Sequence, residues 1–401
     1  MIHIDDISFL YLLLGAFFVC MVIFSLLLNG LMLKFASTLG IRNHDETIIR
    51  WSSASKPALG GISFYIIFLL SVTSYSLFIE QSSILLNKEL IGLLAATGLA
   101  FLMGLSDDAY DTKPLLKLFV QIVCGVILIS TGTYIHLFPS DALNYVFTIL
   151  WVVGIMNSIN MLDNMDAIAT IASIFIVGAA LFIILLSESI AHFNAFIIAG
   201  VLAALIGFLF FNWHPSKMFM GDTGSQFLGI FLAFVGISYF WNHTEVSGTE
   251  IPTKQFIITI LAFTMPIIDT TTVTINRILS GNSPFVGGKD HTTHYLSYIG
   301  FSDKMVARLF ILFSFISITL VFIAVKWIDD WNYIHVALFS AYFATVFISL
   351  YSITKIKKAK LKFFREHRNG HSKLNGKNGH IRPANGQATI EPIKIKKQRV
   401  R

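Results

Sequence analysis

Charged residues are scarce in this chain, since only 13% of its 401 residues are Asp, Glu, Lys or Arg. Soluble domains carry about 25%, so the composition argues against a soluble protein. Cysteine is scarcer still: the two present, Cys20 and Cys124, both lie inside apolar runs. They act there as small apolar residues, so the chain offers neither a disulfide framework nor a cysteine-rich metal site.

Hydrophobic residues make up 55% of the chain and are grouped in long runs separated by short polar segments. A helix that crosses a bilayer needs roughly 20 apolar residues. The sequence therefore predicts an all-α, polytopic integral membrane protein with about 11 transmembrane helices. The eleven runs lie near residues 9–33, 61–79, 90–104, 115–131, 144–157, 167–187, 189–211, 227–241, 254–276, 305–325 and 332–354.

The lysines and arginines predict how these helices are oriented, because cytoplasmic loops carry an excess of basic residues. With eleven crossings, only Lys88, Lys254 and Lys326 of the 29 basic residues fall on one side. We therefore expect the N-terminus outside and the C-terminus in the cytoplasm.

The chain is expected to have two parts, a transmembrane domain over 1–354 and a basic cytoplasmic tail over 355–401. The tail is rich in Lys, Arg, Asn and Gly, a composition that predicts disorder. Alternatively, its first part, KIKKAKLKFFREHR, lies on anionic lipid. The net charge of +6 comes from this tail, so no nucleic-acid partner is expected.

Four polar clusters interrupt the apolar pattern, and all four fall on the side assigned to the cytoplasm. Ionisable residues beside membrane spans are costly and usually functional, although a stray carboxylate at a helix end can be only a cap. The clusters are GLSDDAYDTKPLLKL (104–118), NSINMLDNMD (157–166), KMFMGDTGS (217–225) and GGKDHTTHYL (287–296). Their common side predicts one cytoplasmic site.

The first cluster places Asp107 and Asp108 next to each other and Asp111 one helical turn further on. At this spacing either of the first two can share a helix face with Asp111. Three such carboxylates repel one another unless a divalent metal or a lysine such as Lys113 or Lys117 intervenes. One of them can then act as a base.

The second and third clusters combine carboxylates with amides and small residues. Asn160, Asp163 and Asp166 stand three residues apart, which predicts one stripe of a helix able to hold Mg²⁺ or a nucleoside. In MGDTGS, the backbone N–H groups of the following helix start favour phosphate. Asp222 can approach that phosphate only through a cation, which points to Mg²⁺.

The fourth cluster contains His291 and His294, with Lys289 beside them. This pair of histidines can be read as zinc ligands, as an anion-binding pair or as part of a solvated loop. Zinc would need two further ligands, so phosphate binding is the favoured hypothesis. The other histidines, His214 among them, have no partner at motif spacing and are interpreted as solvated or interfacial.

In this order the clusters resemble the polyprenyl-phosphate N-acetylhexosamine-1-phosphate transferase superfamily. The resemblance runs from about Asp45 to Leu296, and the related muramyl-pentapeptide transferases, with DDxxK and a triple histidine, fit less well. The matching motifs are DDxxD with a trailing lysine (Asp107, Asp108, Asp111, Lys117), NxxNxxDxxD (Asn157, Asn160, Asp163, Asp166), FMGDTGS (Phe219 to Ser225), KPALGG at Lys56, and PIIDT at Pro266 and Asp269 with Arg277.

The resemblance implies an enzyme of the bacterial inner membrane, with its active site on the cytoplasmic face. It would transfer a sugar 1-phosphate, from a UDP-sugar that is expected to carry an N-acetylated amino sugar, to polyprenyl phosphate. UMP would be released and a lipid-linked envelope glycan begun. The resemblance leaves open whether the enzyme forms a homodimer. The implied residues are Asp222 and Asn160 for Mg²⁺ (or Mn²⁺), Asp107, Asp108, Asp111 and Asp163 for catalysis, and Lys56, Lys117, Asn157, Asp166, Phe219, Lys289, His291 and His294 for substrate.

Two departures from the family pattern stand out. The glycines of NxxDGxDG are replaced by Asn164 and Ala167, and the HxHH loop becomes the segment from Lys289 to His294. The second departure affects recognition of the sugar.

Two other functions compete with this one. The Tyr110-Asp111 and Gly221-Asp222 pairs partly match an intramembrane aspartyl protease, but the first glycine of its GxGD motif is missing. A transporter would place acids near the midplane and often shows repeated halves, whereas here the acids gather on one side.

Overall fold

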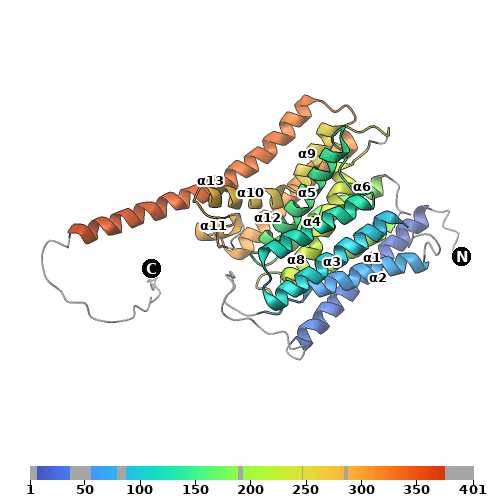
Figure 1. Ribbon diagram of the computed structural model, residues 1–401, viewed down its shortest axis with the longest axis horizontal. Helices are drawn as coiled ribbons and strands as arrows, with labels where there is room; N and C mark the ends of the chain where they lie inside the picture. The colour runs from blue at the N-terminus through green and yellow to red at the C-terminus, as the bar shows by residue number, and fades with distance from the viewer. Residues whose placement is uncertain are drawn as a thin grey trace, which may run out of the picture. The chain divides into compact units, whose positions relative to one another are not determined.

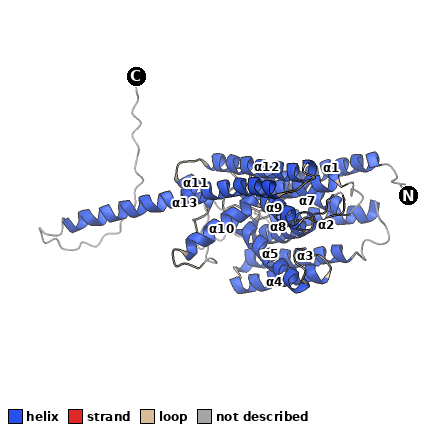
Figure 2. Ribbon diagram, turned by 90° about the horizontal axis from the view of Figure 1, so that it is seen from above, coloured by secondary structure: helices blue, strands red, loops and turns tan. Residues whose placement is uncertain are grey.

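The computed structural model describes residues 7–36, 56–78, 87–187, 193–245, 247–283 and 288–374, with side chains up to 355. Helices dominate these residues (Figures 1 and 2), which confirms the all-α prediction. They are α1 (Ile7–Phe35), α2 (Gly60–Phe78), α3 (Lys88–Tyr110), α4 (Pro114–Ser130), α5 (Asp141–Leu162), α6 (Ile168–Leu186), α7 (Phe193–Asn212), α8 (Gly221–Val235), η3 (Gly236–Trp241), α9 (Pro252–Ala262), α10 (Thr264–Ile278), α11 (Thr292–Tyr298), α12 (Asp303–Trp327) and α13 (Tyr333–Leu374).

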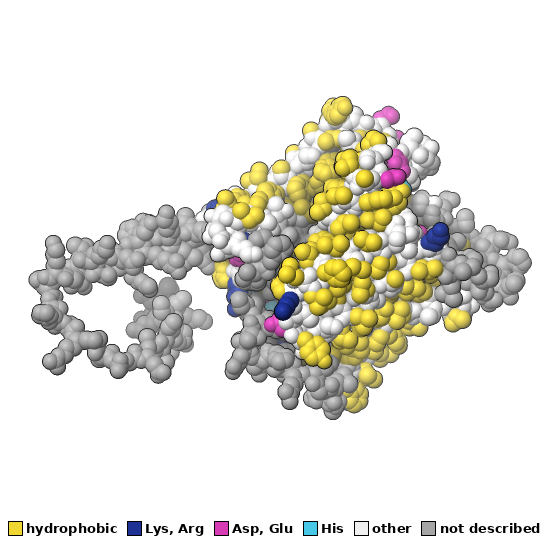
Figure 3. Space-filling model, in the orientation of Figure 1, with side chains coloured by type: hydrophobic (Ala, Val, Ile, Leu, Met, Phe, Trp, Pro, Cys, Tyr) yellow, Lys and Arg dark blue, Asp and Glu magenta, His cyan; other side chains and the backbone are white. Residues whose placement is uncertain are grey.

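Nine helices in the described part of the chain are long and apolar enough to cross a membrane, with α8 and η3 acting as one. A bent pair, α9 and α10, makes up to ten, and α4 is a shorter apolar helix of 17 residues. Each of the eleven predicted runs thus falls on a helix or helix pair. Apolar side chains cover much of the bundle surface, with charged groups at its margins (Figure 3). The chain is a multi-pass membrane protein; the side on which each terminus lies stays a prediction.

The predicted ninth span, 254–276, is not one straight helix. The chain bends by 78° between α9 and α10, at Phe263. Pro266 lacks a backbone N–H and its ring would clash with the preceding turn of a continuous helix, so it is tolerated only where a helix begins. A new helix therefore starts at Thr264, and its polar residues, Asp269 and Arg277 among them, are buried against the bundle.

The helix α8 lies at the centre of the bundle and packs against α2, α3 and α5. Two glycines allow its first turn to be approached this closely. A Cβ on Gly104 of α3 would lie 2.4 Å from the carbonyl oxygen of Asp222, and one on Gly61 of α2 would lie 2.1 Å from the nitrogen of Gly224. Any larger residue would push α2 or α3 away from the MGDTGS motif.

Contacts divide the chain into two units, Met1–Thr354 and Lys355–Arg401. Thr354 is fully buried in the first unit, where its hydroxyl accepts a hydrogen bond from Asn276 of 3.0 Å. The helix α13 continues through Leu374, beyond the domain boundary predicted at 354. The rest of the predicted tail, residues 375–401, lies outside the described residues.

The turn between α5 and α6 departs from the predicted helical stripe. Helix α5 ends at Leu162 and Asp163 is its C-cap, so Asp166 does not continue the stripe begun by Asn160. At the end of the turn Ala167 adopts a left-handed conformation, with φ of 68°. Its N–H donates to the side-chain oxygen of Asn212 at 3.1 Å, which holds the backbone there.

Replacing Ala167 by glycine should stabilise the protein without altering the turn. The left-handed conformation costs a non-glycine residue about 1–2 kcal/mol, and the entropic cost of glycine, about 0.5–1 kcal/mol, offsets part of that gain. We expect the free energy of unfolding to rise by up to about 1 kcal/mol, measured as a higher melting temperature in detergent. Ala172→Gly, in the right-handed interior of α6, is the matched control and should lower it. A drop for both variants would contradict the strain assigned to Ala167.

Candidate active site

The carboxylate of Asp108, near the end of α3, caps the N-terminus of α8. It accepts hydrogen bonds from the backbone N–H groups of Asp222 (2.9 Å) and Thr223 (2.8 Å), and from the hydroxyl of Thr223 (2.6 Å). A carboxylate at this position also matches the positive end of the helix dipole. Asp108 thus occupies two of the N–H groups that were expected to bind phosphate, those of Asp222 and Thr223.

Beside this cap, side chains from four helices meet around Asp222. The amide of Asn160 in α5 donates to the Asp222 carboxylate and lies 2.9 Å from the hydroxyl of Ser225. Lys117 in α4 forms an ion pair with Asp107 of α3, and its ammonium lies 4.0 Å from Asp222. A single cation thus stands between two carboxylates that would otherwise repel each other.

Asn157, predicted to bind substrate, lies one helical turn from Asn160 and supports the site from the side. Its amide donates to Gln121 of α4 at 2.7 Å, and Gln121 in turn donates to Gln226 of α8 at 3.3 Å. These bonds hold α4, α5 and α8 in register around Asp222.

A second group forms where the segment before α2 lies along the segment before α8. Phe219 donates its N–H to the carbonyl of Pro57 (3.0 Å) and accepts at its own carbonyl from Gly60 (3.1 Å). This pairing places the ammonium of Lys56 5.0 Å from the centre of the Phe219 ring and 3.8 Å from a carboxylate oxygen of Asp166. Three of the predicted substrate-binding residues therefore lie together.

The carboxylate of Asp166 is anchored by the loop between α7 and α8. Ser216 donates to it from its N–H (2.9 Å) and its hydroxyl (2.7 Å). The imidazole Nδ1 of His214 lies 3.0 Å from Asp166 and 3.8 Å from Asp303 at the start of α12. The expectation that His214 is solvated or interfacial is therefore wrong. Its partners are remote in sequence, so no local spacing could reveal them.

A third group is built on α10. The buried carboxylate of Asp269 lies 2.8 Å from Nδ1 of His291 and accepts the N–H of Thr292 at 2.9 Å. Arg277 binds Asp290 through two parallel hydrogen bonds of 2.8 and 2.7 Å, a strong and directional pairing. The PIIDT motif alone does not reveal that Asp269 and Arg277 are site residues, because the bend at Phe263 is what brings them to His291 and Asp290.

The remaining predicted residues lie around these groups. Asp111 is exposed and is the left-handed C-cap of α3, so the prediction that it shares a helix face with Asp107 or Asp108 is wrong. Asp163 is half-buried at the C-cap of α5. The side chain of Lys289 is exposed, and its carbonyl accepts from the hydroxyl of Tyr298 at 3.2 Å.

The oxygen atoms around Asp222 suit a hard cation. In the described part of the chain no three His, Cys, Asp or Glu side chains gather into a metal cage. Mg²⁺ does not require such a cage, since it is usually held by one or two carboxylates together with substrate phosphates. Asp222, whose side chain is 34% exposed, fits this arrangement. Asn160 faces Asp222 with its amide nitrogen, so its amide oxygen would reach a cation held there only after the amide turns over.

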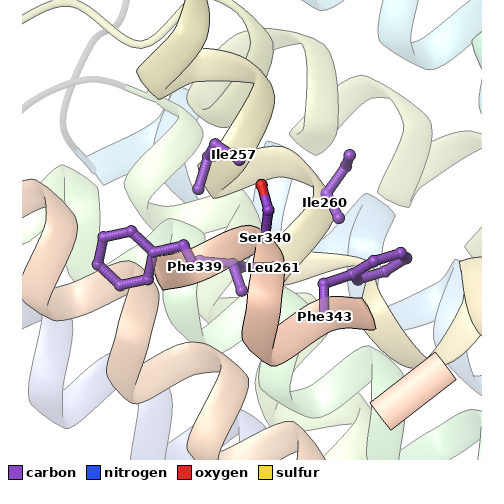
Figure 4. A pocket seen from close by; sticks show the side chains of 6 residues that line it. All are labelled: Ile257, Ile260, Leu261, Phe339, Ser340 and Phe343. Carbon is purple, nitrogen blue, oxygen red and sulfur yellow. The ribbon is translucent and has the colours of Figure 1, made fainter. Parts of the chain in front are cut away.

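A small apolar hollow of about 50 Å³ lies elsewhere, between α9 and α13 (Figure 4). Its lining has no ionisable group, so it cannot supply acid–base or metal chemistry. The lining residues are Ile257, Ile260, Leu261, Phe339, Ser340 and Phe343.

Comparison with known proteins finds similarity over the part of the chain that carries Asp107, Asn160 and Asp222. Residues 90–240 match the model of glycosyl transferase family 4. A Bacillus subtilis protein described as a probable undecaprenyl-phosphate N-acetylglucosaminyl 1-phosphate transferase is 28% identical over 269 residues, which cover 65% of this chain and 71% of that protein.

Phospho-N-acetylmuramoyl-pentapeptide-transferases also match. That of Streptococcus agalactiae is 28% identical over 50% of this chain and 64% of its own length, and that of Campylobacter jejuni is 29% identical over 52% and 69%. The chain thus spans slightly less than two thirds of the streptococcal relative.

His294 should make the stability of the protein depend on pH. Burial and the nearby His291 lower the pKa of His294 to about 4, against about 6.5 in an unfolded chain. The folded state therefore binds this proton less readily, so stability is complete above pH 6.5 and is lost as the pH falls from 6.5 towards 4. We expect a loss on the order of 2 kcal/mol by pH 5, seen as a falling melting temperature. His294→Gln should flatten this fall; parallel curves for the two proteins would contradict the assignment.

Proposed function

This chain belongs to the superfamily that contains glycosyl transferase family 4, and we propose on that basis that it transfers a sugar 1-phosphate from a UDP-sugar to polyprenyl phosphate. UMP is the second product. The observation that carries the proposal is the convergence of Asp222, Asn160 and Lys117 within the part of the chain that matches the family. We further propose that the sugar is an N-acetylated amino sugar and that the product begins a lipid-linked envelope glycan.

In the proposed reaction, an oxygen of the lipid phosphate attacks the β-phosphorus of the UDP-sugar. A new phosphoanhydride bond forms, the bond between the α- and β-phosphates breaks, and UMP leaves with the electron pair. Such transfers depend mainly on positioning and on neutralising negative charge. Bound Mg²⁺, or Mn²⁺, held by Asp222 and Asn160 would supply part of that neutralisation.

The protein's own contribution is to hold the charged groups in place. Lys117 offers its ammonium to the diphosphate, and Asp107 keeps that ammonium directed into the site. Asp108 holds the backbone that carries Asp222. These fixed charges need not reorganise during the reaction, which is what makes such sites effective.

The other two groups suit the two ends of the donor. Phe219 presents an aromatic ring beside Lys56 and Asp166, and we assign this group to uridine. His291 is oriented by Asp269, and with His294 and Lys289 we assign it to the sugar phosphate. The pKa of about 4 keeps His294 uncharged at neutral pH.

We place the enzyme in the bacterial inner membrane with this site facing the cytoplasm, where UDP-sugars are made. The distribution of lysine and arginine between the loops supports this orientation.

Release of UMP tests the proposed function. Purified protein in detergent would be given polyprenyl phosphate, Mg²⁺ and each of a panel of UDP-sugars. We expect UMP to form with a UDP-N-acetylhexosamine, and only when both the lipid and Mg²⁺ are present. Release that does not need the lipid, or no release with any UDP-sugar, would overturn the proposal.

The variant Asp222→Asn should reduce turnover by at least ~10²-fold, the scale for losing one strong electrostatic contact in a transition state. The amide keeps the shape and hydrogen bonding of the carboxylate but removes the charge that attracts a hard cation. UMP release is measured against Mg²⁺ concentration, and a higher Mg²⁺ requirement should accompany the loss. Asp141→Asn, exposed at the start of α5, is the matched control. Near-normal turnover of Asp222→Asn with an unchanged Mg²⁺ curve would place the metal elsewhere.

A further inference from the structure

The two places where this chain departs from the family pattern touch each other in space. Thr293 lies in the segment from Lys289 to Tyr298, called the histidine segment below. Its hydroxyl donates to the side-chain oxygen of Asn164 at 2.6 Å. Asn164 stands where the family pattern has glycine, which has no side chain to accept this bond. The two departures therefore belong to one contact.

The geometry of this contact is well defined on both sides. The amide nitrogen of Asn164 donates to the carbonyl of Met161 at 2.8 Å, which turns its oxygen towards Thr293. Thr293 is fully buried, and His294 next to it is buried as well. A buried hydroxyl that loses its acceptor is costly. The hydroxyl of Thr293 is therefore strongly held in its hydrogen bond with Asn164.

The other anchors of the segment lead to different elements. Asp269 and Arg277 tie it to α10, and the hydroxyl of Ser297 donates to Asp303 of α12 at 3.0 Å. Asn164 instead ties it to the turn between α5 and α6. That turn also carries Asp166, which lies with the group assigned to uridine.

We propose that the hydrogen bond between Asn164 and Thr293 is a positioning latch that sets how the sugar 1-phosphate of the donor is recognised. It fixes the spacing between the histidine segment and the uridine group, so that both ends of one UDP-sugar can be held at once. This inference rests on the proposed function. Neither residue belongs to the cluster around Asp222, so the latch acts on donor binding rather than on the bond-breaking step.

Loss of this hydrogen bond should weaken binding of the sugar-phosphate end of the donor and leave binding of the nucleotide end unchanged. Thr293→Val keeps the shape of the side chain but removes the hydroxyl, and Asn164→Ala removes the acceptor. Each should raise the KM for the UDP-sugar by about 5–20-fold, as expected for the loss of one buried hydrogen bond, with kcat changed by less than about 3-fold. Competitive inhibition by UMP, which lacks the sugar phosphate, should be unchanged.

Two further variants act as controls. Thr293→Ser keeps the hydroxyl and should keep the wild-type KM. The double variant Asn164→Ala with Thr293→Val should be no worse than the poorer single variant, because both remove the same bond.

The outcomes distinguish this inference from the proposed function. Active wild-type protein with unchanged KM in both single variants, or with additive effects in the double variant, overturns the latch alone. Equal losses of donor and UMP affinity also overturn it, since they indicate general damage. Wild-type protein that releases no UMP from any UDP-sugar overturns both.

Discussion

The carboxylate of Asp108 against the N-terminus of α8 is the interaction on which the rest of the site depends. Helix α8 is the most enclosed element, and its first turn carries Asp222. With no cap supplied by its own preceding residue Met220, the helix takes one from α3. Gly61 and Gly104 then bring α2 and α3 into backbone contact with the same turn. The position of Asp222 is thus set by backbone packing and a charge-assisted cap, both of which are difficult to deform.

The end of α5 and the turn that leads to α6 supply side chains to three parts of the site. The last turn of α5 presents Asn160 to Asp222, and the turn that follows presents Asn164 to the histidine segment and Asp166 to Lys56. A continued helix would place Asn160 and Asn164, which are four residues apart, on the same face. The chain leaves the helix instead and accepts a left-handed alanine at residue 167, a local strain of the kind that surrounding structure must sustain.

The bend in the ninth span also brings polar side chains to the site. A straight apolar helix would bury only apolar side chains in the bilayer, whereas α10 turns by 78° and carries Asp269 and Arg277 to the polar end of the bundle. Both charges are then satisfied by the histidine segment, through His291 and Asp290. Burying them in this way is acceptable because each is paired and hydrogen-bonded. The segment is thereby anchored on α10, α12 and the α5–α6 turn.

The sequence by itself determined the helical membrane architecture and the four polar clusters, because apolar length and residue spacing are local properties of a chain. Its resemblance to a known family predicted Asp222 and Asn160 at one metal and Lys117 at the diphosphate, and the structure brings these three residues together. Three outcomes were decided only by tertiary structure. Asp108 serves as a cap rather than sharing a face with Asp111, His214 bridges two carboxylates, and Asn164 meets Thr293. Each of these joins residues far apart in sequence, and such contacts depend on how the helices end and pack, which no local pattern of residues encodes.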